Sequence, residues 1–255
     1  MIQEFTRVVR NEIVALDTFV LSFESETISR TVLPGQFINL RAWAGTDPLL
    51  RRPFSIYKTD KGTASIVFNI VGKGTRVLSE LKPGDTLDVL GPLGRPFGFN
   101  SGDFDTAILV GGGLGVAPLP ILSDSLKKLR IPLITLLGAR TKGHLVPQHL
   151  EHLTTATDDG SSGFAGTVVD LARKVIQNQK SERPKIFGCG PTPMLRALSE
   201  MADELQLPCE ISLEGPMGCG FGICQGCPVR LRDRAGEYAL MCREGPVFES
   251  DRVEI

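Results

Sequence analysis

Hydrophobic and polar side chains alternate in short segments over residues 1–100 of the chain. The alternation is clearest in residues 18–23, 36–40, 65–70 and 86–89. This period places successive side chains on opposite faces of a β-strand, and turn-forming prolines and glycines separate the segments. Short strands with frequent turns predict a closed antiparallel β-barrel, or a sandwich, for residues 1–100.

The pattern changes near residue 105, where continuous apolar runs replace the alternation. Residues 106–110 and 133–137 are typical of strands buried on both faces, and Ile186 begins a third run of this kind. Longer segments with helical spacing lie between these runs. Strands that alternate with helices predict an α/β domain with a doubly wound parallel sheet, which we assign to residues 101–208.

One helix of this domain is marked by six apolar residues that share a helical face: Met194, Leu195, Leu198, Met201, Ala202 and Leu205. We expect Thr192 to cap its N-terminus, with Pro193 at the first helical position. Neither period continues after Cys209, where the chain becomes rich in glycine and cysteine. We therefore expect a third, small domain over residues 209–255, too short to bury much apolar surface without a metal centre.

Charge and composition argue against two broad classes of protein. The chain has 28 basic and 29 acidic residues, whereas a nucleic-acid-binding protein needs a basic surface. The uncharged run 106–123 has the length of a membrane span, but its glycines and prolines argue against a spanning helix. Residues 1–10 lack the apolar segment of a secretion signal. We expect a cytoplasmic protein without nucleic-acid or membrane partners.

Four cysteines near the end of the chain have the spacing of a metal centre. Cys219, Cys224, Cys227 and Cys242 are separated by four, two and fourteen residues, with glycines around the first three. The first two gaps match plant-type [2Fe–2S] proteins, and glycines give the bare backbone that the sulfides of a cluster require. The alternatives are a structural zinc site, which favours two closely spaced pairs, and disulfides, which need an oxidising compartment.

A glycine-rich turn follows the first buried strand of the α/β domain. Gly111, Gly112, Gly113, Gly115 and Pro118 lie between this strand and a predicted helix. Glycines let the backbone approach a diphosphate closely, and the first turn of a helix favours negative charge. The segment departs from the G-x-G-x-x-G pattern, so a tight turn without a ligand is the alternative. Its place at the carboxyl edge of the sheet favours a nucleotide site.

Two segments of the β domain combine residue types that suit a phosphate group and a planar ring. One is Arg52-Pro53-Phe54-Ser55, which places an arginine beside an aromatic ring and a hydroxyl group. The other is Asn69-Ile70-Val71-Gly72-Lys73-Gly74-Thr75, which offers small residues and a hydroxyl group for further phosphate contacts. The alternative is an edge strand with a solvated arginine, followed by a glycine turn.

Taken in this order, the motifs resemble those of the ferredoxin–NADP reductase superfamily. The resemblance implies an FAD-binding β-barrel in which Arg52-Pro53-Phe54-Ser55 and residues 69–75 hold the flavin, although Phe54 replaces a tyrosine of the superfamily. It also implies that residues 111–118 and Cys189-Gly190-Pro191 bind the nicotinamide nucleotide. Cys189 is then expected where nicotinamide meets the flavin, and a small buried strand residue is the alternative.

The cysteine segment narrows the resemblance to the electron-transfer subunits of class 1B dihydroorotate dehydrogenases. Residues 217–227 and Cys242, followed by residues 244–248, carry this similarity. It implies an oxidoreductase subunit with FAD and one [2Fe–2S] cluster, which passes electrons between NAD and a separate FMN-bearing catalytic subunit in pyrimidine biosynthesis. We expect a heterotetramer with two copies of each subunit. The alternatives are a related flavin and iron–sulfur reductase for ferredoxin or sulfide, and a zinc-stapled binding module without redox activity.

Several residues receive no role from the sequence. Residues 138–142 include two basic residues and no acid for a ribose hydroxyl, so the sequence is compatible with both NAD and NADP. We expect His144, His149 and His152 to form a polar, solvated segment and not a metal site, because no complete ligand set accompanies them. Cys209 has no assigned role, and no catalytic triad or carboxylate pair stands out.

Overall fold

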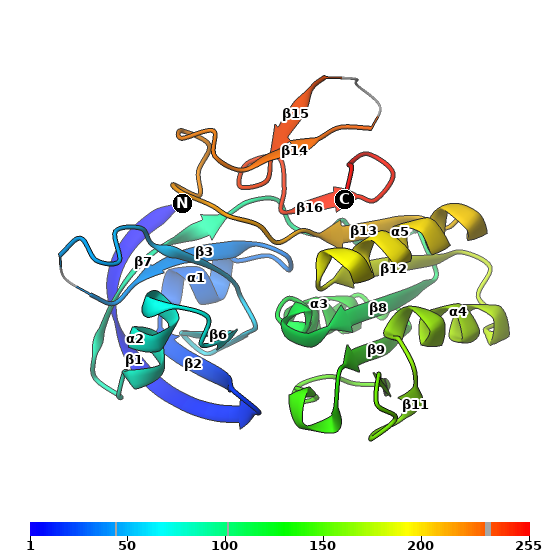
Figure 1. Ribbon diagram of the computed structural model, residues 1–255, viewed down its shortest axis with the longest axis horizontal. Helices are drawn as coiled ribbons and strands as arrows, with labels where there is room; N and C mark the ends of the chain where they lie inside the picture. Colours follow the sequence, from blue (N-terminus) through cyan, green and yellow to red (C-terminus); the bar gives the residue numbers. More distant parts are fainter. Residues whose placement is uncertain (44, 101, 233–235) are drawn as a thin grey trace.

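The computed structural model describes residues 1–43, 45–100, 102–232 and 236–255, so residue 101, the predicted start of the second domain, lies outside the described residues. Figure 1 shows two large sheets side by side and a small two-stranded ribbon above them. Each large sheet has seven strands.

The first sheet is antiparallel and curls into a half-barrel. In spatial order its strands are β4 (Arg52–Ser55), β3 (Phe37–Arg41), β7 (Thr86–Leu93), β1 (Ile2–Ala15), β2 (Thr18–Glu24), β6 (Thr63–Asn69) and β5 (Lys58–Asp60). The long strand β1 pairs with β7 through its first half and with β2 through its second half, so it carries the curl across the sheet. The predicted alternating segments are confirmed as β2, β3, β6 and β7.

The sheet is a half-barrel and not the closed barrel that the sequence predicts. Strands β4 and β5 form its two edges, and a corner at Ile56 and Tyr57 joins them in place of a ladder. The N–H of Ile56 donates to the carbonyl of Gln36 (3.3 Å), and that of Tyr57 to the carbonyl of Ser65 (2.8 Å). Among the described residues no ladder joins β4 to β5, so the sheet stays open between them.

The interior of the half-barrel holds its hydrophobic core. Side chains from five strands fill it, including Leu21, Phe23, Ile38, Leu40, Ile66, Phe68 and Val89. Helix α1 (Glu26–Thr31) adds Ile28, whose N–H donates to the side chain of the N-cap Ser25 (3.0 Å). Helix α2 (Lys73–Glu80) adds Leu78 and begins inside the segment predicted to contact phosphate.

The second sheet is doubly wound, as the sequence predicts. In spatial order its strands are β11 (Phe164–Ala165), β10 (Leu153–Thr157), β9 (Leu133–Ala139), β8 (Thr106–Gly112), β12 (Pro184–Cys189), β13 (Cys209–Ser212) and β16 (Val247–Glu249), all parallel except β16. Helix α3 (Leu119–Lys128) packs on one face, and α4 (Val168–Asn178) and α5 (Thr192–Leu205) pack on the other. Short 3-10 turns follow β8 and β9: η1 (Gly113–Val116) and η2 (Lys142–His144).

The uncharged run 106–123 forms β8, η1 and the start of α3. Within the part of the chain that the structure describes, no helix has the length and hydropathy needed to cross a membrane.

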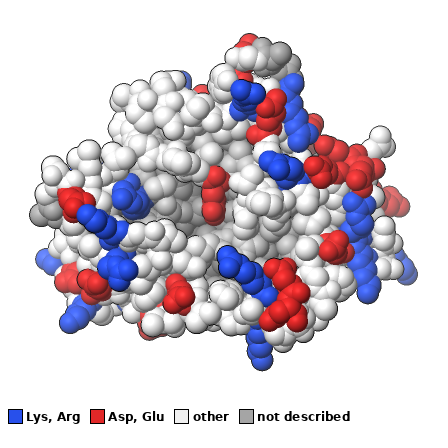
Figure 2. All heavy atoms as spheres, in the orientation of Figure 1, with Lys and Arg blue, Asp and Glu red and all other residues white. Residues whose placement is uncertain are grey.

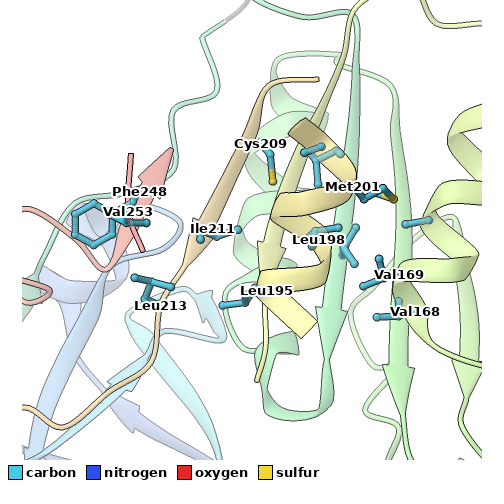
Figure 3. Close-up of a cluster of buried hydrophobic side chains, with 14 of the residues drawn as sticks. Val168, Val169, Leu195, Leu198, Met201, Cys209, Ile211, Leu213, Phe248 and Val253 are labelled. Atoms are coloured by element: carbon cyan, nitrogen blue, oxygen red, sulfur yellow. The ribbon is translucent and has the colours of Figure 1, made fainter. Parts of the chain in front are cut away.

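Helix α5 has the apolar face that the sequence predicts. Figure 3 shows Leu195 and Leu198 of this helix on the side of Ile211 of β13, and Met201 on the side of Val169. These side chains and Cys209 are buried in one cluster. Burial raises the pKa of Cys209 to about 12. Cys209 is therefore an uncharged core residue at neutral pH.

The N-cap predicted for α5 is wrong by one residue. The N-cap is Pro191, and Thr192 and Pro193 are the first two helical residues. Pro191 has extended backbone angles (φ −59°, ψ 145°), and its carbonyl accepts the N–H of Leu195 at 3.0 Å. The proline that ends the loop after β12 therefore also starts the helix, and no side-chain cap is formed.

The C-terminal segment is anchored in the second sheet at both ends. Strand β13 pairs with β12, and β16 pairs with β13 in antiparallel register. Between them, β14 (Pro228–Arg230) and β15 (Tyr238–Leu240) form the ribbon at the top of Figure 1. Phe248 and Val253 join the core of the α/β domain. The limit predicted after residue 208 thus falls just before a strand of the second sheet, and the division into three domains stays a prediction.

An apolar seam joins the half-barrel to the second sheet. Its buried residues come from both halves: Val20, Tyr57 and Val67 from the half-barrel, and Val116, Ala117, Leu137, Leu145 and Val146 from the α/β domain. The Tyr57 hydroxyl donates to the carbonyl of Gln148 (2.9 Å), and burial raises its pKa to about 12. These contacts hold the two halves in one orientation.

A partly buried ion pair ties the end of the half-barrel to the second sheet. The Lys185 ammonium group lies 3.0 Å from Oε1 of Glu210, and the two side chains are 14 % and 12 % exposed. Lys185 also donates to the carbonyl of Gly98 (2.7 Å), and the N–H of Gly98 donates to Glu210 (2.7 Å). The rings of Phe104 and Phe187 lie 5.7 and 5.1 Å from the ammonium nitrogen. Both charges are therefore well partnered.

Lys185→Ala should lower the free energy of unfolding by about 3 kcal/mol, because it leaves the Glu210 carboxylate poorly hydrated and without its cation. Lys127→Ala is the control, since the Lys127–Glu151 pair is exposed and contributes little. Urea unfolding followed by circular dichroism measures both changes. Equal destabilisation by the two substitutions would contradict this role for Lys185.

Candidate functional site

A cavity of about 750 Å³ opens between the half-barrel and the α/β domain, where Figure 2 shows a hollow at the centre of this face. Residues of both halves line it, including Asp17, Thr18 and Asn69 from the first, and Gly112, Gly113, Gly115, Pro191 and Met194 from the second. Open α/β sheets bind ligands outside the carboxyl ends of their strands, and β8, β9 and β12 end here. The cavity is therefore the candidate nucleotide site.

The two loops predicted to bind the nucleotide meet at this cavity. Four of their predicted residues line it: Gly112, Gly113, Gly115 and Pro191. Asn69, from the segment predicted to hold the flavin, also lines it. Gly111, Pro118, Cys189 and Gly190 are buried in the packing instead. A Cβ at Gly115 would lie 2.0 Å from the carbonyl oxygen of Cys189. The loops after β8 and β12 thus touch at a position that glycine alone fits.

Charged and titratable residues that received no role from the sequence also line the cavity: Arg140, His144, Asp158 and Glu214. Arg140 directly follows β9 and Asp158 directly follows β10. Residues 138–142 contain no acid, but the parallel pairing of β9 and β10 brings Asp158 to the same edge of the sheet as Arg140. The Nδ1 of His144 is hydrogen-bonded to the hydroxyl of Thr141 (2.9 Å). His144 therefore belongs to the cavity wall with a partly exposed side chain, and the solvated segment stays a prediction for this residue.

Another histidine of this segment packs beside the seam. The ring of His149 lies edge-on to Tyr57, with 5.8 Å between the ring centroids. Burial lowers the pKa of His149, so neutral imidazole is favoured. Among the described residues, no three histidine, cysteine or acidic side chains are grouped as the ligands of one metal ion.

Glu214 adds a carboxyl group to the cavity close to Cys189. Partial desolvation raises the pKa of the Glu214 carboxyl above its ordinary value, although the residue is exposed. Burial, followed by the charge of Glu214, raises the pKa of the Cys189 thiol well above its ordinary value. Cys189 is 1 % exposed and ends β12, so it is an uncharged thiol next to the cavity. Its place beside nicotinamide stays a prediction.

The two segments predicted to hold the flavin meet at the start of α2. A Cβ at Gly74, in the first turn of α2, would lie 3.0 Å from Nε of Arg52 in β4. The hydroxyl of Thr75 accepts the N–H groups of Val71 (2.9 Å) and Gly72 (3.1 Å), which orders this turn. The first N–H groups of a helix lack partners within the helix. An arginine beside them makes a basic corner suited to a phosphate.

The two neighbouring arginines have different surroundings. Arg51 forms an ion pair with Asp88, and both side chains are mostly buried. The Arg52 guanidinium lies 5.8 Å from the centre of the Trp43 ring and donates to a backbone carbonyl. Nearby on β6, Oδ1 of Asn69 is buried without a hydrogen-bond partner among the described residues. A bound ligand with a donor group would complete such an acceptor.

The four cysteines lie as two pairs. The Sγ atoms of Cys227 and Cys242 are 3.2 Å apart, and the N–H of Cys242 donates to Sγ of Cys227 (3.4 Å). In the other pair, the N–H of Cys224 donates to Sγ of Cys219 (3.5 Å). All four are free thiols.

Two pairs of thiols fit a cluster of two irons, each bound by two cysteines. Residues 218–227, which we call the cluster loop, also direct backbone N–H groups at the sulfur of Cys219. Burial raises the pKa of this thiol, but the N–H groups of Cys224, Phe221 and Ile223 outweigh burial and lower it to about 6. A Cβ at Gly218 would lie 3.2 Å from Sγ of Cys224, so a side chain there would crowd the cluster position.

Comparison with known proteins distinguishes between the functions that the sequence leaves open for these sites. Residues 6–97 match the oxidoreductase FAD-binding domain family, and residues 214–254 match the iron-sulfur cluster binding domain of dihydroorotate dehydrogenase B. The dihydroorotate dehydrogenase B (NAD(+)) electron transfer subunit of Desulforamulus reducens is 39 % identical over 250 residues, 94 % of each chain. That of Geobacillus kaustophilus is 38 % identical over 258 residues, 98 % of each chain. The chain belongs to the family of dihydroorotate dehydrogenase B electron transfer subunits.

Solved structures support the fold of this family member. A structure of NADH-dependent reduced ferredoxin-NADP oxidoreductase superposes with a TM-score of 0.86 at 32 % identity, covering 98 % of this chain and 89 % of that one. The ferredoxin reductase of carbazole 1,9a-dioxygenase, at 22 % identity and a TM-score of 0.70, covers 81 % of this chain and 67 % of that one, and shares the fold. The predicted FAD-binding and iron–sulfur domains of a dihydroorotate dehydrogenase B electron transfer subunit are confirmed.

Anaerobically purified protein should contain about two irons and two sulfides per chain, the content of one [2Fe–2S] cluster. The pairwise arrangement of the cysteines is the structural reason. Iron and sulfide analysis, with metal content by mass spectrometry, measures this directly. One zinc per chain without sulfide would refute the cluster.

Arg52→Ala should weaken FAD binding about 10–100-fold, because loss of a charge-assisted contact costs about 1.5–3 kcal/mol. Arg51→Ala is the matched control. It should lower thermal stability and leave FAD affinity nearly unchanged, because Arg51 pairs with Asp88. Release of FAD, followed by its fluorescence, measures both variants. Equal loss of FAD from the two variants would count against Arg52.

Proposed function

We propose that the chain passes electrons between NAD and a separate FMN-bearing subunit of dihydroorotate dehydrogenase, by way of FAD and a [2Fe–2S] cluster. The observation that carries this proposal is that the half-barrel contacts both neighbouring sites. Asn69 lines the nucleotide cavity, and Asn39, directly opposite Pro53 of the flavin segment, donates to the carbonyl of Cys219 in the cluster loop. A flavin between the nucleotide and the cluster is the order that the chemistry requires.

The residue assignments of the proposal follow the motifs and their surroundings. FAD is held by Arg52–Ser55 and residues 69–75, with Arg52 and the first turn of α2 on its diphosphate. The nicotinamide nucleotide binds along residues 111–118 and 189–191. The cluster is held by four thiolates: Cys219, Cys224, Cys227 and Cys242. The corresponding domains are residues 1–100, 101–208 and 209–255, the last of which contributes β13 and β16 to the second sheet.

When bound, FAD takes a hydride from nicotinamide and releases single electrons, and the cluster carries one electron at a time. The side chains of the chain bind and orient. Asp158 offers an acceptor for a ribose hydroxyl, a contact that favours NAD over NADP, and Arg140 offers a positive charge for phosphate. Glu214 lines the cavity and offers a carboxyl group for hydrogen bonds to the nucleotide.

The cluster loop is also the proposed docking site of the FMN-bearing subunit. Phe221 and Ile223 lie between two of the cluster cysteines and are 38 % and 76 % exposed. Exposed apolar side chains that gather at one place mark contacts with other proteins. We place the partner over this loop, in a complex with two copies of each chain. A cytoplasmic location and a role in pyrimidine biosynthesis belong to the same proposal.

Reconstitution with the partner tests this function. With NADH, the isolated chain should reduce artificial one-electron acceptors and leave dihydroorotate unchanged. Addition of the FMN-bearing subunit should couple dihydroorotate oxidation to NAD reduction, and much less to NADP reduction. Cys224→Ser should abolish the coupling and spare the reduction of FAD by NADH, because Cys224 is proposed to bind the cluster and not the nucleotide. Turnover of dihydroorotate by the chain alone would contradict the proposal.

Ile223→Glu tests the docking site in the same assay. The charge should weaken association with the FMN-bearing subunit and leave NADH-dependent reduction of artificial acceptors intact. Ile13→Glu is the control, since Ile13 is equally exposed (71 %) but lies on β1 of the half-barrel. Equal binding of the partner by both variants would place the docking surface elsewhere.

Reduction of ferredoxin is a second candidate function. The similarity to NADH-dependent reduced ferredoxin-NADP oxidoreductase, at a TM-score of 0.86, favours it. The two candidates differ in the acceptor at the cluster loop. Reduced ferredoxin formed at a higher rate than partner-coupled dihydroorotate oxidation would favour this second function.

A further inference from the structure

Asn39 lies where the flavin segment and the cluster loop come together. It occupies the middle of β3, opposite Pro53 of β4 and Leu90 of β7, and is 1 % exposed. Its neighbours Ile38 and Leu40 belong to the core of the half-barrel. Successive side chains of a strand point to opposite faces, so Asn39 points away from that core, toward the C-terminal segment.

Asn39 holds the cluster loop through a hydrogen bond and a close contact. Its Nδ2 donates to the carbonyl of Cys219 (2.9 Å), although the two residues are 180 positions apart in the sequence. Gly220 has a φ of +83°, and a Cβ there would lie 2.1 Å from Nδ2 of Asn39. The backbone of the loop therefore rests directly on the amide, at the first of the four cysteines.

The other end of the amide has no partner. Oδ1 of Asn39 is buried and lacks a hydrogen bond among the described residues. An unsatisfied buried acceptor costs about 1–3 kcal/mol, so an apolar side chain of similar size would suit the sheet at least as well. Only a side chain with a hydrogen-bond donor at this position can form the bond to the carbonyl of Cys219.

We propose that Asn39 is a positioning residue that sets the rate of electron transfer between the flavin and the cluster. This inference rests on the proposed function. Each electron that leaves the reduced flavin reduces one ferric iron of the cluster, and such a transfer slows steeply as the separation grows. Asn39 fixes this separation, because its strand pairs with the flavin segment at Pro53 and its amide holds the backbone of Cys219.

Asn39→Leu in the full chain, loaded with FAD and cluster, tests the proposal. Anaerobic stopped-flow mixing with NADH separates the bleaching of the flavin from that of the cluster. We expect flavin reduction at the wild-type rate and cluster reduction slowed about tenfold or more, the usual effect of losing a residue that orients a metal ligand. The EPR g-values of the chemically reduced cluster should also shift, because the backbone of Cys219 is released.

Asn11→Leu is the matched control. Nδ2 of Asn11 likewise donates to backbone carbonyls, those of Leu78 and Leu81 (both 2.9 Å), and its Oδ1 is also buried without a partner among the described residues. These carbonyls lie at the end of α2 and not in the cluster loop. Asn11→Leu should keep the wild-type rate of cluster reduction and the wild-type EPR spectrum.

If Asn39→Leu does not fold, Asn39→Ser provides the same test. Its side chain keeps a polar group in the sheet but is too short to reach Cys219, so slow cluster reduction is again expected. A wild-type rate and EPR spectrum in the folded Asn39 variant would overturn the proposal, as would slow cluster reduction in Asn11→Leu. Failure of NADH to reduce the cluster of the unmodified chain would refute the proposed function itself, independently of Asn39.

Discussion

The candidate sites depend on the apolar seam between the half-barrel and the second sheet. Tyr57 and Val67 pack there with Leu145 and Val146, and each buried side chain of this size contributes about 1.5–3 kcal/mol. Electrons pass only between groups that lie close together, so the cavity, the flavin segment and the cluster loop need fixed relative positions. Buried side chains from both halves pack together along the seam and fix one orientation of the half-barrel relative to the second sheet. A flexible linker alone would leave that orientation variable.

Local sequence patterns predict most of the fold, because alternation and apolar runs depend on neighbouring residues. They mark β2, β3, β6 and β7 in the half-barrel and β8, β9 and β12 in the second sheet. Pairing between distant segments is not encoded in this way. Strand β16 has three residues and pairs with β13 at the edge of the second sheet, and β4 and β5 meet at a corner at Ile56 and Tyr57.

The same distinction applies to the candidate site. The cysteine spacing and the glycine loop are continuous in the sequence, so their chemistry can be predicted before the fold is known. Asp158 and Glu214 gain their places from strands that end at one edge of the sheet, and Asn39 from a loop 180 residues away. An acid directly after a strand, or an amide inside an apolar strand, is the signal that could have marked these residues.

The central claim is that electrons pass from NADH to the cluster only by way of FAD. Anaerobic titration of the chain with NADH, with and without FAD, tests this claim most directly. Visible absorbance and the EPR spectrum report the oxidation state of the cluster. We expect NADH to reduce the cluster when FAD is bound, to leave it oxidised after FAD is removed, and to reduce it again once FAD is restored. Reduction of the cluster by NADH in the FAD-free chain would contradict this route.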